Sequence, residues 1–318
     1  MIESGGFFRG NLARLLQSAD KTQWMNVYVK SVNSIYDVSQ RTYLNAELKE
    51  LSEMSKHPNV LAMVGFVKLK RGISIVYEYM EGGDLQTFVK KFKSNGFLNQ
   101  LEPASTGQFY NTEANSALDS DMNSLSTMDL LSFAYQICNG LQFLSEHSDI
   151  HPYLALRKIL IAKNKTIRIS DFSLEKRLNE KQYYRLIPPA MTDPSCYCSP
   201  EALDGTEARV TIKSDVWAFA VCLQELFTLG EKVYESVPVV YHFLKQGGRL
   251  AQPEFCHDDI YKLMLKCWNM DPSSRPTVSN CLEFFKEHFE SHSLKILDQI
   301  ESKLRDASEF QKELGEWV

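Results

Sequence analysis

A lysine and a glutamate near the start of the chain have types and spacing that could do chemistry. Lys30 ends the apolar, strand-like run from Val27, and Glu47 lies seventeen residues later in a helical pattern. Glu47 would lie on the face of this helix that is turned toward Lys30, so the two side chains could form an ion pair. Taken alone, a surface lysine and a solvated helix glutamate explain both residues, since exposed pairs are common and weak. The pair therefore gains meaning only from the segments that follow it.

Six short segments with charged, aromatic or proline residues follow in a set order. They are His151 to Ile161, Ile169 to Leu174, Ser199 to Glu201, Ser214 to Phe219, Cys267 to Trp268 and Asp271 to Pro276. With the lysine and glutamate before them, they resemble the protein-kinase signature of VAIK, helix glutamate, HRDLxxxN, DFG and APE. The resemblance covers roughly residues 3 to 288. It implies a bilobal α+β fold with a small β-sheet lobe and a larger, mainly helical lobe.

Among kinases, the chain is similar to tyrosine kinases through LALR at 154–157, DVWAFAV at 215–221 and LMLKCW at 263–268. AELKELSEMSKHPNV, EYMEGGDL and a long polar insertion resemble the split-kinase-domain receptors of the platelet-derived and fibroblast growth factor receptor group. The resemblance implies a cytoplasmic domain, which would lie at the cytoplasmic face of the plasma membrane if a receptor segment precedes it.

The catalytic positions depart from the family pattern. The aspartate that acts as base aligns with Tyr153, whose phenol cannot accept a proton at pH 7 as a carboxylate does. The asparagine that binds a second Mg²⁺ aligns with Lys158, whose ammonium repels metal and could instead neutralise phosphate. Asp171 keeps the metal-binding carboxylate, but Ser173 replaces the glycine that follows it in the pattern.

The nucleotide pocket is also altered. Glu3 to Gly10 aligns with GxGxFGxV and keeps only Gly5 of the three glycines. Tyr28 replaces the alanine above adenine, Tyr77 occupies the position at the back of the pocket, and Leu160 remains as its floor. Because a phenol adds many atoms to a close-packed space, we expect Tyr28 to project into the space that adenine occupies in active relatives, to complete the apolar stack above the floor and so to replace the ligand.

Positions that support the fold are retained. Glu201 and Arg275 match the buried ion pair of the family, and the residues that stack from the small-lobe helix into the core are His151, Phe172, Leu51 and Asp215. A chain that keeps the residues supporting the fold but replaces those of the reaction is expected to be a pseudokinase. We expect it to work as a scaffold or allosteric regulator that binds other signalling proteins, an active tyrosine kinase among them, without a cofactor.

Two alternatives stay open. The first is an active tyrosine kinase that uses ATP and Mg²⁺ with Lys30, Glu47 and Asp171, and with an atypical base such as Asp149. The second is a non-catalytic nucleotide sensor in which Lys158 contacts phosphate in place of a metal. Fold analogy does not choose among the three hypotheses.

Three tyrosines are candidates for phosphorylation by another kinase. Tyr183 and Tyr184 lie in the expected activation segment, and Tyr110 lies in the insertion. Phosphate there would supply charge and acceptors for an arginine-lined partner. Packing of Tyr183 and Tyr184 on the large lobe explains that pair equally well.

Hydrophobic periodicity indicates the elements that must position these residues. Strand patterns cover 24–32 and 72–80, and helical patterns cover 43–56, 128–145, 214–229, 260–269 and 278–288. We therefore expect a small lobe at 1–80, a large lobe at 81–290 with a mobile insertion at about 94–126, and a helical tail at 291–318.

Composition narrows the function classes. The chain has 318 residues, is 44% hydrophobic and 24% charged, and has a net charge of −5, so binding to nucleic acid is not expected. The seven cysteines have no close metal-ligand pairing beyond Cys196 and Cys198, and this odd number fits a reducing compartment. No apolar run is long enough to span a bilayer.

An apolar stripe follows the last kinase motif, with spacings mostly of three and four residues. Its members are Leu297, Ile300, Leu304, Ala307 and Leu314. The stripe predicts a helix that docks on its own large lobe, and self-association through a short coiled coil is the alternative.

Overall fold

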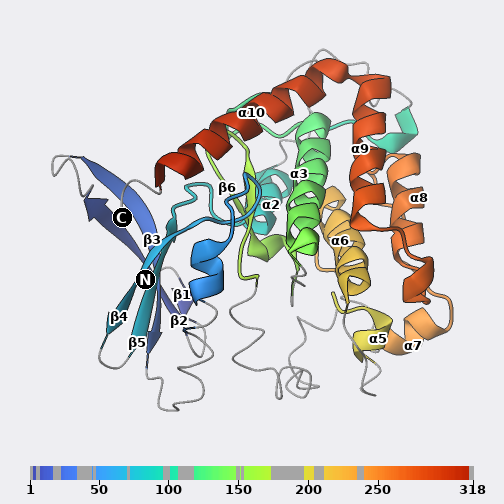
Figure 1. Ribbon diagram of the computed structural model, residues 1–318. Coiled ribbons are helices and arrows are strands. Elements are labelled where there is room, and N and C mark those ends of the chain that lie inside the picture. Colours follow the sequence, from blue (N-terminus) through green and yellow to red (C-terminus); the bar gives the residue numbers. More distant parts are fainter. Residues whose placement is uncertain are drawn as a thin grey trace.

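The computed structural model describes residues 3–4, 8–16, 23–33, 45, 48–69, 72–95, 101–106, 118–147, 151, 154–172, 197–203, 211–234 and 240–314. Its two lobes lie side by side, with a β-sheet in one and a group of packed helices in the other (Figure 1). None of the helices in these ranges is long and apolar enough to cross a membrane.

The small lobe is built on an antiparallel sheet of five strands in the order β1-β2-β3-β5-β4. The strands are β1 (Glu3–Ser4), β2 (Phe8–Leu16), β3 (Trp24–Asn33), β4 (Met63–Leu69) and β5 (Gly72–Glu78). Residues 48–53, between β3 and β4, are helical. The two strands and the helix predicted here are thus present, and β5 ends two residues before the predicted boundary.

The large lobe is mainly helical. Its longer helices are α2 (Leu85–Asn95), α3 (Thr127–Glu146), α6 (Ile212–Phe227), α8 (Asp258–Cys267), α9 (Val278–His292) and α10 (Leu294–Glu313). Shorter elements are η1 (Ala104–Thr106), η3 (Leu156–Lys158), β6 (Ile159–Ile161), β7 (Ile167–Ile169), α5 (Pro200–Leu203), α7 (Val240–Lys245) and η5 (Pro272–Ser274). The central helix α3 begins at a capping box, in which Ser126 and Asp129 satisfy each other's backbone donors.

The described residues at the two ends of the expected insertion at about 94–126 are packed against the large lobe, whereas residues 96–100 and 107–117 lie outside the described part of the chain. Leu101 and Leu125 are buried in the large-lobe core, and the backbone N–H of Ala104 donates to the carbonyl of Glu254 at 2.9 Å. The segment looked polar because its few apolar residues are too widely spaced to form a period. Those residues are nevertheless the ones that pack.

The predicted buried ion pair is confirmed. Arg275 donates from Nη1 and Nη2 to the two carboxylate oxygens of Glu201 at 2.8 and 2.7 Å. The guanidinium also lies 5.1 Å from the ring of the buried Trp217. A bidentate bond and an aromatic face together satisfy a charge that would otherwise be costly to bury.

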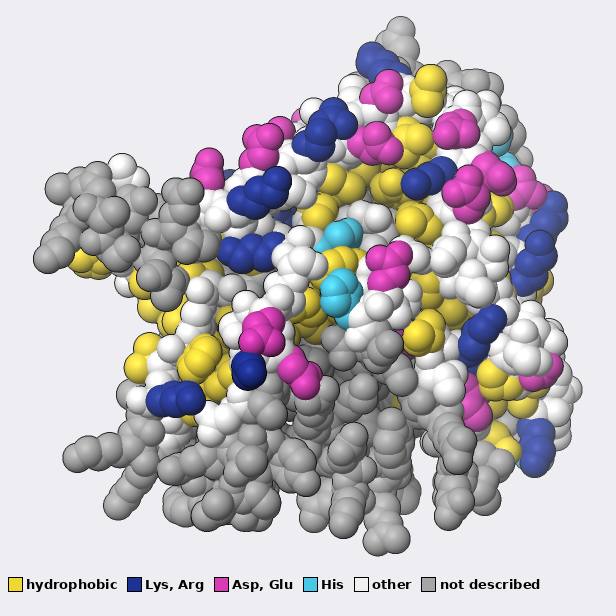
Figure 2. Space-filling model, viewed as in Figure 1, with side chains coloured by type: hydrophobic (Ala, Val, Ile, Leu, Met, Phe, Trp, Pro, Cys, Tyr) yellow, Lys and Arg dark blue, Asp and Glu magenta, His cyan; other side chains and the backbone are white. Residues whose placement is uncertain are grey.

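Helix α10 docks on its own domain, as preferred from the sequence. It runs from the end of α9 back across the large lobe to the small lobe (Figure 1). The apolar stripe is buried, and the outer side of the helix is covered by acidic and basic side chains (Figure 2). Gln311, which stands within the stripe, is also fully buried.

Two histidines, His151 and His288, are buried, and a third, His57, is half-buried against the ring of Phe143. Burial lowers the pKa of His57, His151 and His288 from the ordinary 6.5 to about 4 in each case. His57 stacks on Phe143 with ring centroids 4.7 Å apart and accepts from the N–H of Asn59 at 3.2 Å. All three rings are therefore neutral at pH 7.

We predict that stability falls as pH decreases from 7 to 5. The unfolded chain takes up protons near pH 6.5 and the folded protein only near pH 4, so protonation favours unfolding in this range. Each histidine should cost on the order of 2 kcal/mol at pH 5. His57→Asn, whose amide oxygen can still accept the bond to residue 59, should make the decrease in urea midpoint shallower. His242→Asn, at an exposed position, should leave the slope unchanged, and equal slopes for all three proteins would contradict the assignment.

Candidate functional site

A cleft with a cavity of about 320 Å³ lies between the lobes. Its wall is formed by β3 and β5 of the small lobe, and its floor by η3, β6 and the residues after β7. All six of the described residues that we assigned to the ligand pocket line it: Tyr28, Lys30, Tyr77, Lys158, Leu160 and Asp171. Apolar surface from the tyrosines and Leu160 thus leads to a cluster of charged groups.

The charged cluster has one carboxylate between two ammonium groups. Nζ of Lys30 lies 2.6 Å from Oδ1 of Asp171, and Nζ of Lys158 lies 2.5 Å from Oδ2. Lys30 comes from β3, Lys158 from the end of η3, and Asp171 from the segment after β7. Both carboxylate oxygens therefore accept bonds from lysines of the protein.

The backbone directs the Asp171 side chain toward these lysines. Asp171 has a φ of 57°, which is uncommon for a residue other than glycine and is better tolerated by aspartate than by most others. The residue before it is fixed, because Nε2 of His151 donates to the carbonyl of Ser170 at 2.8 Å. His151 is held in turn by Asp215, whose Oδ2 accepts its backbone N–H at 2.9 Å.

The two lysines determine the protonation of Asp171. Burial favours the neutral carboxyl group, but the charges of Lys30 and Lys158 outweigh burial and hold the pKa of Asp171 well below its usual range. The carboxylate is therefore ionised at any physiological pH. Its contribution to stability is lost only when pH falls below the range in which the unfolded carboxyl group titrates.

The donor set at the cluster does not fit Mg²⁺. Magnesium requires several oxygen ligands in near-octahedral geometry, and both oxygens of Asp171 already bind ammonium groups. The described part of the chain contains no group of three or more acidic, histidine or cysteine side chains arranged to hold a metal. A metal here would have to displace two cations of the protein itself.

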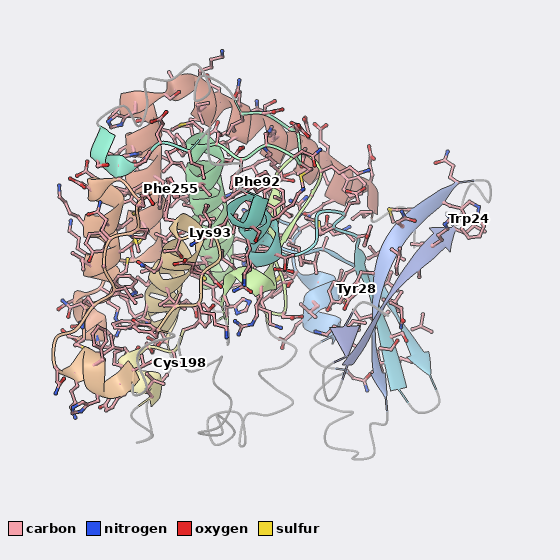
Figure 3. All side chains as sticks on the ribbon, turned by 180° about the vertical axis from the view of Figure 1, so that it is seen from behind. Trp24, Tyr28, Phe92, Lys93, Cys198 and Phe255 are labelled. Atoms are coloured by element: carbon pink, nitrogen blue, oxygen red, sulfur yellow. The ribbon has the colours of Figure 1, made fainter. Side chains whose placement is uncertain are left out.

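Tyr28 lines the cleft without filling it, because Gly10 gives its ring a place. In the β2–β3 ladder Gly10 is opposite Lys30 and Leu12 is opposite Tyr28, so Gly10 and Tyr28 are diagonal neighbours on one face. A Cβ at Gly10 would lie 1.9 Å from the Tyr28 hydroxyl oxygen. Figure 3 shows Tyr28 on the side of the sheet toward the large lobe, with Trp24 at the distant end of the same strand.

Gly10 is a site residue that the sequence reasoning overlooked. The pattern GxGxFGxV has a valine where this chain has Gly10, while Tyr28 stands where the pattern of the pocket has alanine. A large residue at one position thus matches a missing side chain at the other. The signal was in the sequence, but it appears only when the two strands are placed in register.

Seven predicted site residues lie outside the described residues. They are Gly5, Glu47, Asp149 and Tyr153 of the catalytic pattern and its alternative base, and Tyr110, Tyr183 and Tyr184 of the candidate phosphorylation sites. Their roles stay predictions.

The fold and the cleft are those of a protein kinase. The protein tyrosine and serine/threonine kinase family matches residues 2–285, and the chain belongs to that family. The bilobal α+β fold expected from the sequence is thereby confirmed.

The relatives of the chain are receptor tyrosine kinases, as the sequence motifs indicated. It is 35% identical over 315 residues to the receptor-like tyrosine-protein kinase kin-15 of Caenorhabditis elegans. The aligned region covers 94% of this chain and 64% of that protein. It is 35% identical over 323 residues to the tyrosine-protein kinase receptor old-1 of the same organism, covering 98% and 60%. It is 28% identical over 331 residues to the mast/stem cell growth factor receptor Kit of Takifugu rubripes, covering 89% and 33%. The chain thus spans less than two thirds of each of these relatives.

We predict a strong coupling between positions 10 and 28. Gly10→Ala should destabilise the protein by about 1–3 kcal/mol, because the new methyl group overlaps the Tyr28 ring. In a Tyr28→Ala background the same change should be neutral or stabilising, since alanine suits a strand better than glycine. Urea unfolding of the four proteins measures the coupling. Tyr77→Phe provides a control background in which Gly10→Ala should keep its full cost, and equal costs in all backgrounds would contradict this packing.

Proposed function

We propose that this domain is a pseudokinase, a tyrosine-kinase-like domain of impaired catalysis that acts as a scaffold or allosteric regulator. The observation that carries the proposal is the Lys30–Asp171–Lys158 cluster, in which protein cations bind both oxygens of the one metal-binding carboxylate retained by the motif. Phosphoryl transfer depends on metal ions that neutralise the developing charge. A cluster that opposes metal binding opposes that chemistry.

The catalytic loop supports the same proposal. Its pattern has Tyr153 at the position of the base and Lys158 at the position of a metal-binding asparagine. A phenol is a poor proton acceptor at pH 7, and an ammonium has no lone pair for a metal. Two separate requirements of the reaction are therefore weakened by residue type alone.

A nucleotide sensor without catalysis is the second candidate. The cleft retains about 320 Å³, lined by the aromatic rings of Tyr28 and Tyr77 and ending at two ammonium groups. That combination suits a planar ring attached to an anionic group. Lys158 would then neutralise phosphate directly, and binding would not require Mg²⁺.

An active tyrosine kinase is the third candidate, and the names of the relatives favour it. The matching proteins are named as tyrosine kinases or growth factor receptors. This candidate requires ATP and Mg²⁺ to rearrange the charged cluster, and a base other than residue 153. On the same names we propose a cytoplasmic location, at the plasma membrane when the domain is part of a receptor, with signalling proteins as partners.

Metal and nucleotide titrations of the full chain separate the three candidates. We expect no phosphotransfer to the protein or to tyrosine peptides above buffer, and no Mn²⁺ binding by electron paramagnetic resonance. Lys158→Asn should allow Mn²⁺ to bind, because it removes one of the two competing ammonium groups and adds an amide oxygen. Lys163→Asn is the matched control, because it makes the same chemical change at an exposed lysine whose Nζ lies 3.8 Å from Oε1 of Glu81 and which is not part of the Asp171 cluster.

The outcomes differ for each candidate. ATP that raises the melting temperature equally in Mg²⁺ and in chelator, without phosphotransfer, would replace the scaffold proposal by the nucleotide sensor. Phosphotransfer that requires Mg²⁺ and disappears in Lys30→Met would establish the active kinase and end both other candidates.

A further inference from the structure

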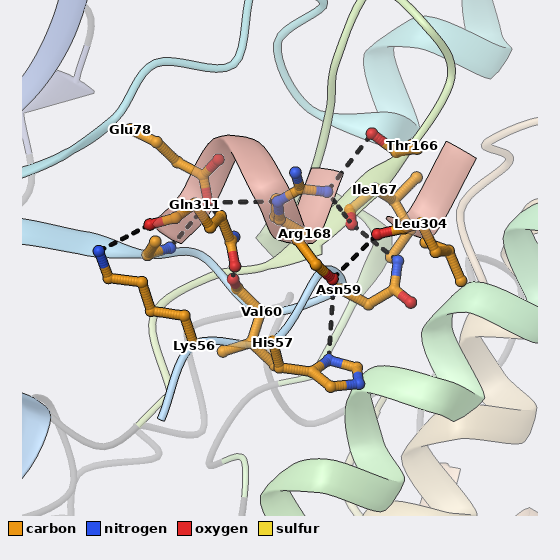
Figure 4. A network of polar contacts seen from close by, with 12 residues as sticks. Lys56, His57, Asn59, Val60, Glu78, Thr166, Ile167, Arg168, Leu304 and Gln311 are labelled. Atoms are coloured by element: carbon orange, nitrogen blue, oxygen red, sulfur yellow. Dashed lines mark hydrogen bonds and ion pairs between the residues drawn. The ribbon is translucent and has the colours of Figure 1, made fainter. Parts of the chain in front are cut away.

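The end of α10 enters a buried polar network at the rear of the small lobe (Figure 4). Nε2 of Gln311 donates to Oε1 of Glu78 at 2.7 Å and to the carbonyl of Val60 at 3.1 Å. In the opposite direction, Nζ of Lys56 donates to the carbonyl of Gln311 at 2.7 Å. One residue of the tail therefore contacts both β5 and the loop that precedes β4.

Glu78 is the point at which three parts of the molecule meet. Its Oε1 also accepts the backbone N–H of Ala62 at 2.8 Å and Nε of Arg168, from β7 of the large lobe, at 3.2 Å. Both charged side chains are almost fully buried. Through this oxygen α10 is bonded to the same group that connects the small lobe to the large lobe.

The strand that carries Glu78 also forms the wall of the cleft. Tyr77 faces the cavity, and the residues on either side of it point to the other face of the sheet by alternation. On that other face Leu314, at the end of α10, is fully buried in a small cluster with Ala62 and Val64, against which Val76 packs. Helix α10 thus holds the rear of β5, and β5 presents its front to the cleft.

One hydrogen-bond acceptor at the docked end of α10 is buried without a partner in the described part of the chain. Oε1 of Gln311 is buried and has no hydrogen-bond partner among the described residues. An unpaired buried oxygen opposes docking, so the attachment is weaker than the number of its contacts indicates. The remainder of the helix is secured separately, because Ile300 and Leu304 belong to the large-lobe core.

We propose that α10 is a built-in regulator of the cleft. When its end is docked through Gln311 and Leu314, β5 is held against the large lobe and the cleft stays narrow. When its end is released, the small lobe is free to move and the cleft opens. Gln311 is a positioning residue in this device. The proposal concerns the shape of the cleft and does not depend on which of the candidate functions is correct.

Hydrogen exchange and lysine labelling of the full chain test the proposal. Gln311→Glu places a second carboxylate beside Glu78 and should release the end of the helix. We expect amide exchange in β5 and in residues 57–62 to increase at least about tenfold, and reductive methylation of Lys30, which is 6% exposed, to increase several-fold.

Gln299→Glu is the matched control. It makes the same chemical change on the same helix, but Gln299 contacts the large lobe, where its Oε1 accepts the N–H of Leu118 at 2.8 Å, and glutamate keeps that acceptor. Both rates should stay at the wild-type level. Faster exchange confined to residues 306–314, or an equal effect of Gln299→Glu, would overturn the proposal. If Gln311→Glu also increases exchange throughout α6, Gln311→Met, which removes the donor without adding charge, decides by the same two readouts.

Discussion

The arrangement of this domain depends on one carboxylate that accepts bonds from two lysines. Lys30 belongs to the small lobe, whereas Lys158 and Asp171 belong to the large lobe. The cluster therefore joins the lobes with charges that the protein supplies, at the place where a kinase uses metal and phosphate for the same purpose. The left-handed turn at Asp171 and the histidine bonded to Ser170 serve to keep that carboxylate in position.

A second polar connection joins the lobes behind the cleft. There Glu78 of the small lobe meets Arg168 of the large lobe, and the loop residue Asn59 donates to Gln136 of α3 at 3.1 Å. These groups are buried, so removal of one partner would leave an uncompensated polar group. With connections at front and rear, the lobes have little freedom to rotate while both remain intact.

Sequence reasoning succeeded where a pattern is local or a motif is specific. Strand and helix periods located β3, β5 and α3, and the bidentate Glu201–Arg275 pair followed from the family motif. It did not find specific polar contacts between segments that the local patterns describe separately. The bond between Lys158 and Asp171 was not anticipated, and Gln311 was passed over because only apolar members of the α10 stripe were counted. The spacing of that stripe leaves a gap at 311, and the gap is where the buried polar residue stands.

The position of Leu314 also affects how the chain completes its fold. This residue closes a cluster with Ala62 and Val64, partners that precede it by about 250 residues. Contacts of such large sequence separation form late, because the entropy of ordering the intervening chain is lost before the contacts stabilise the fold. During synthesis the rear of the small-lobe sheet therefore stays uncovered until residue 314 has emerged from the ribosome. Val64 and Val76 are then an exposed apolar surface on a growing chain, the kind of surface that chaperones bind.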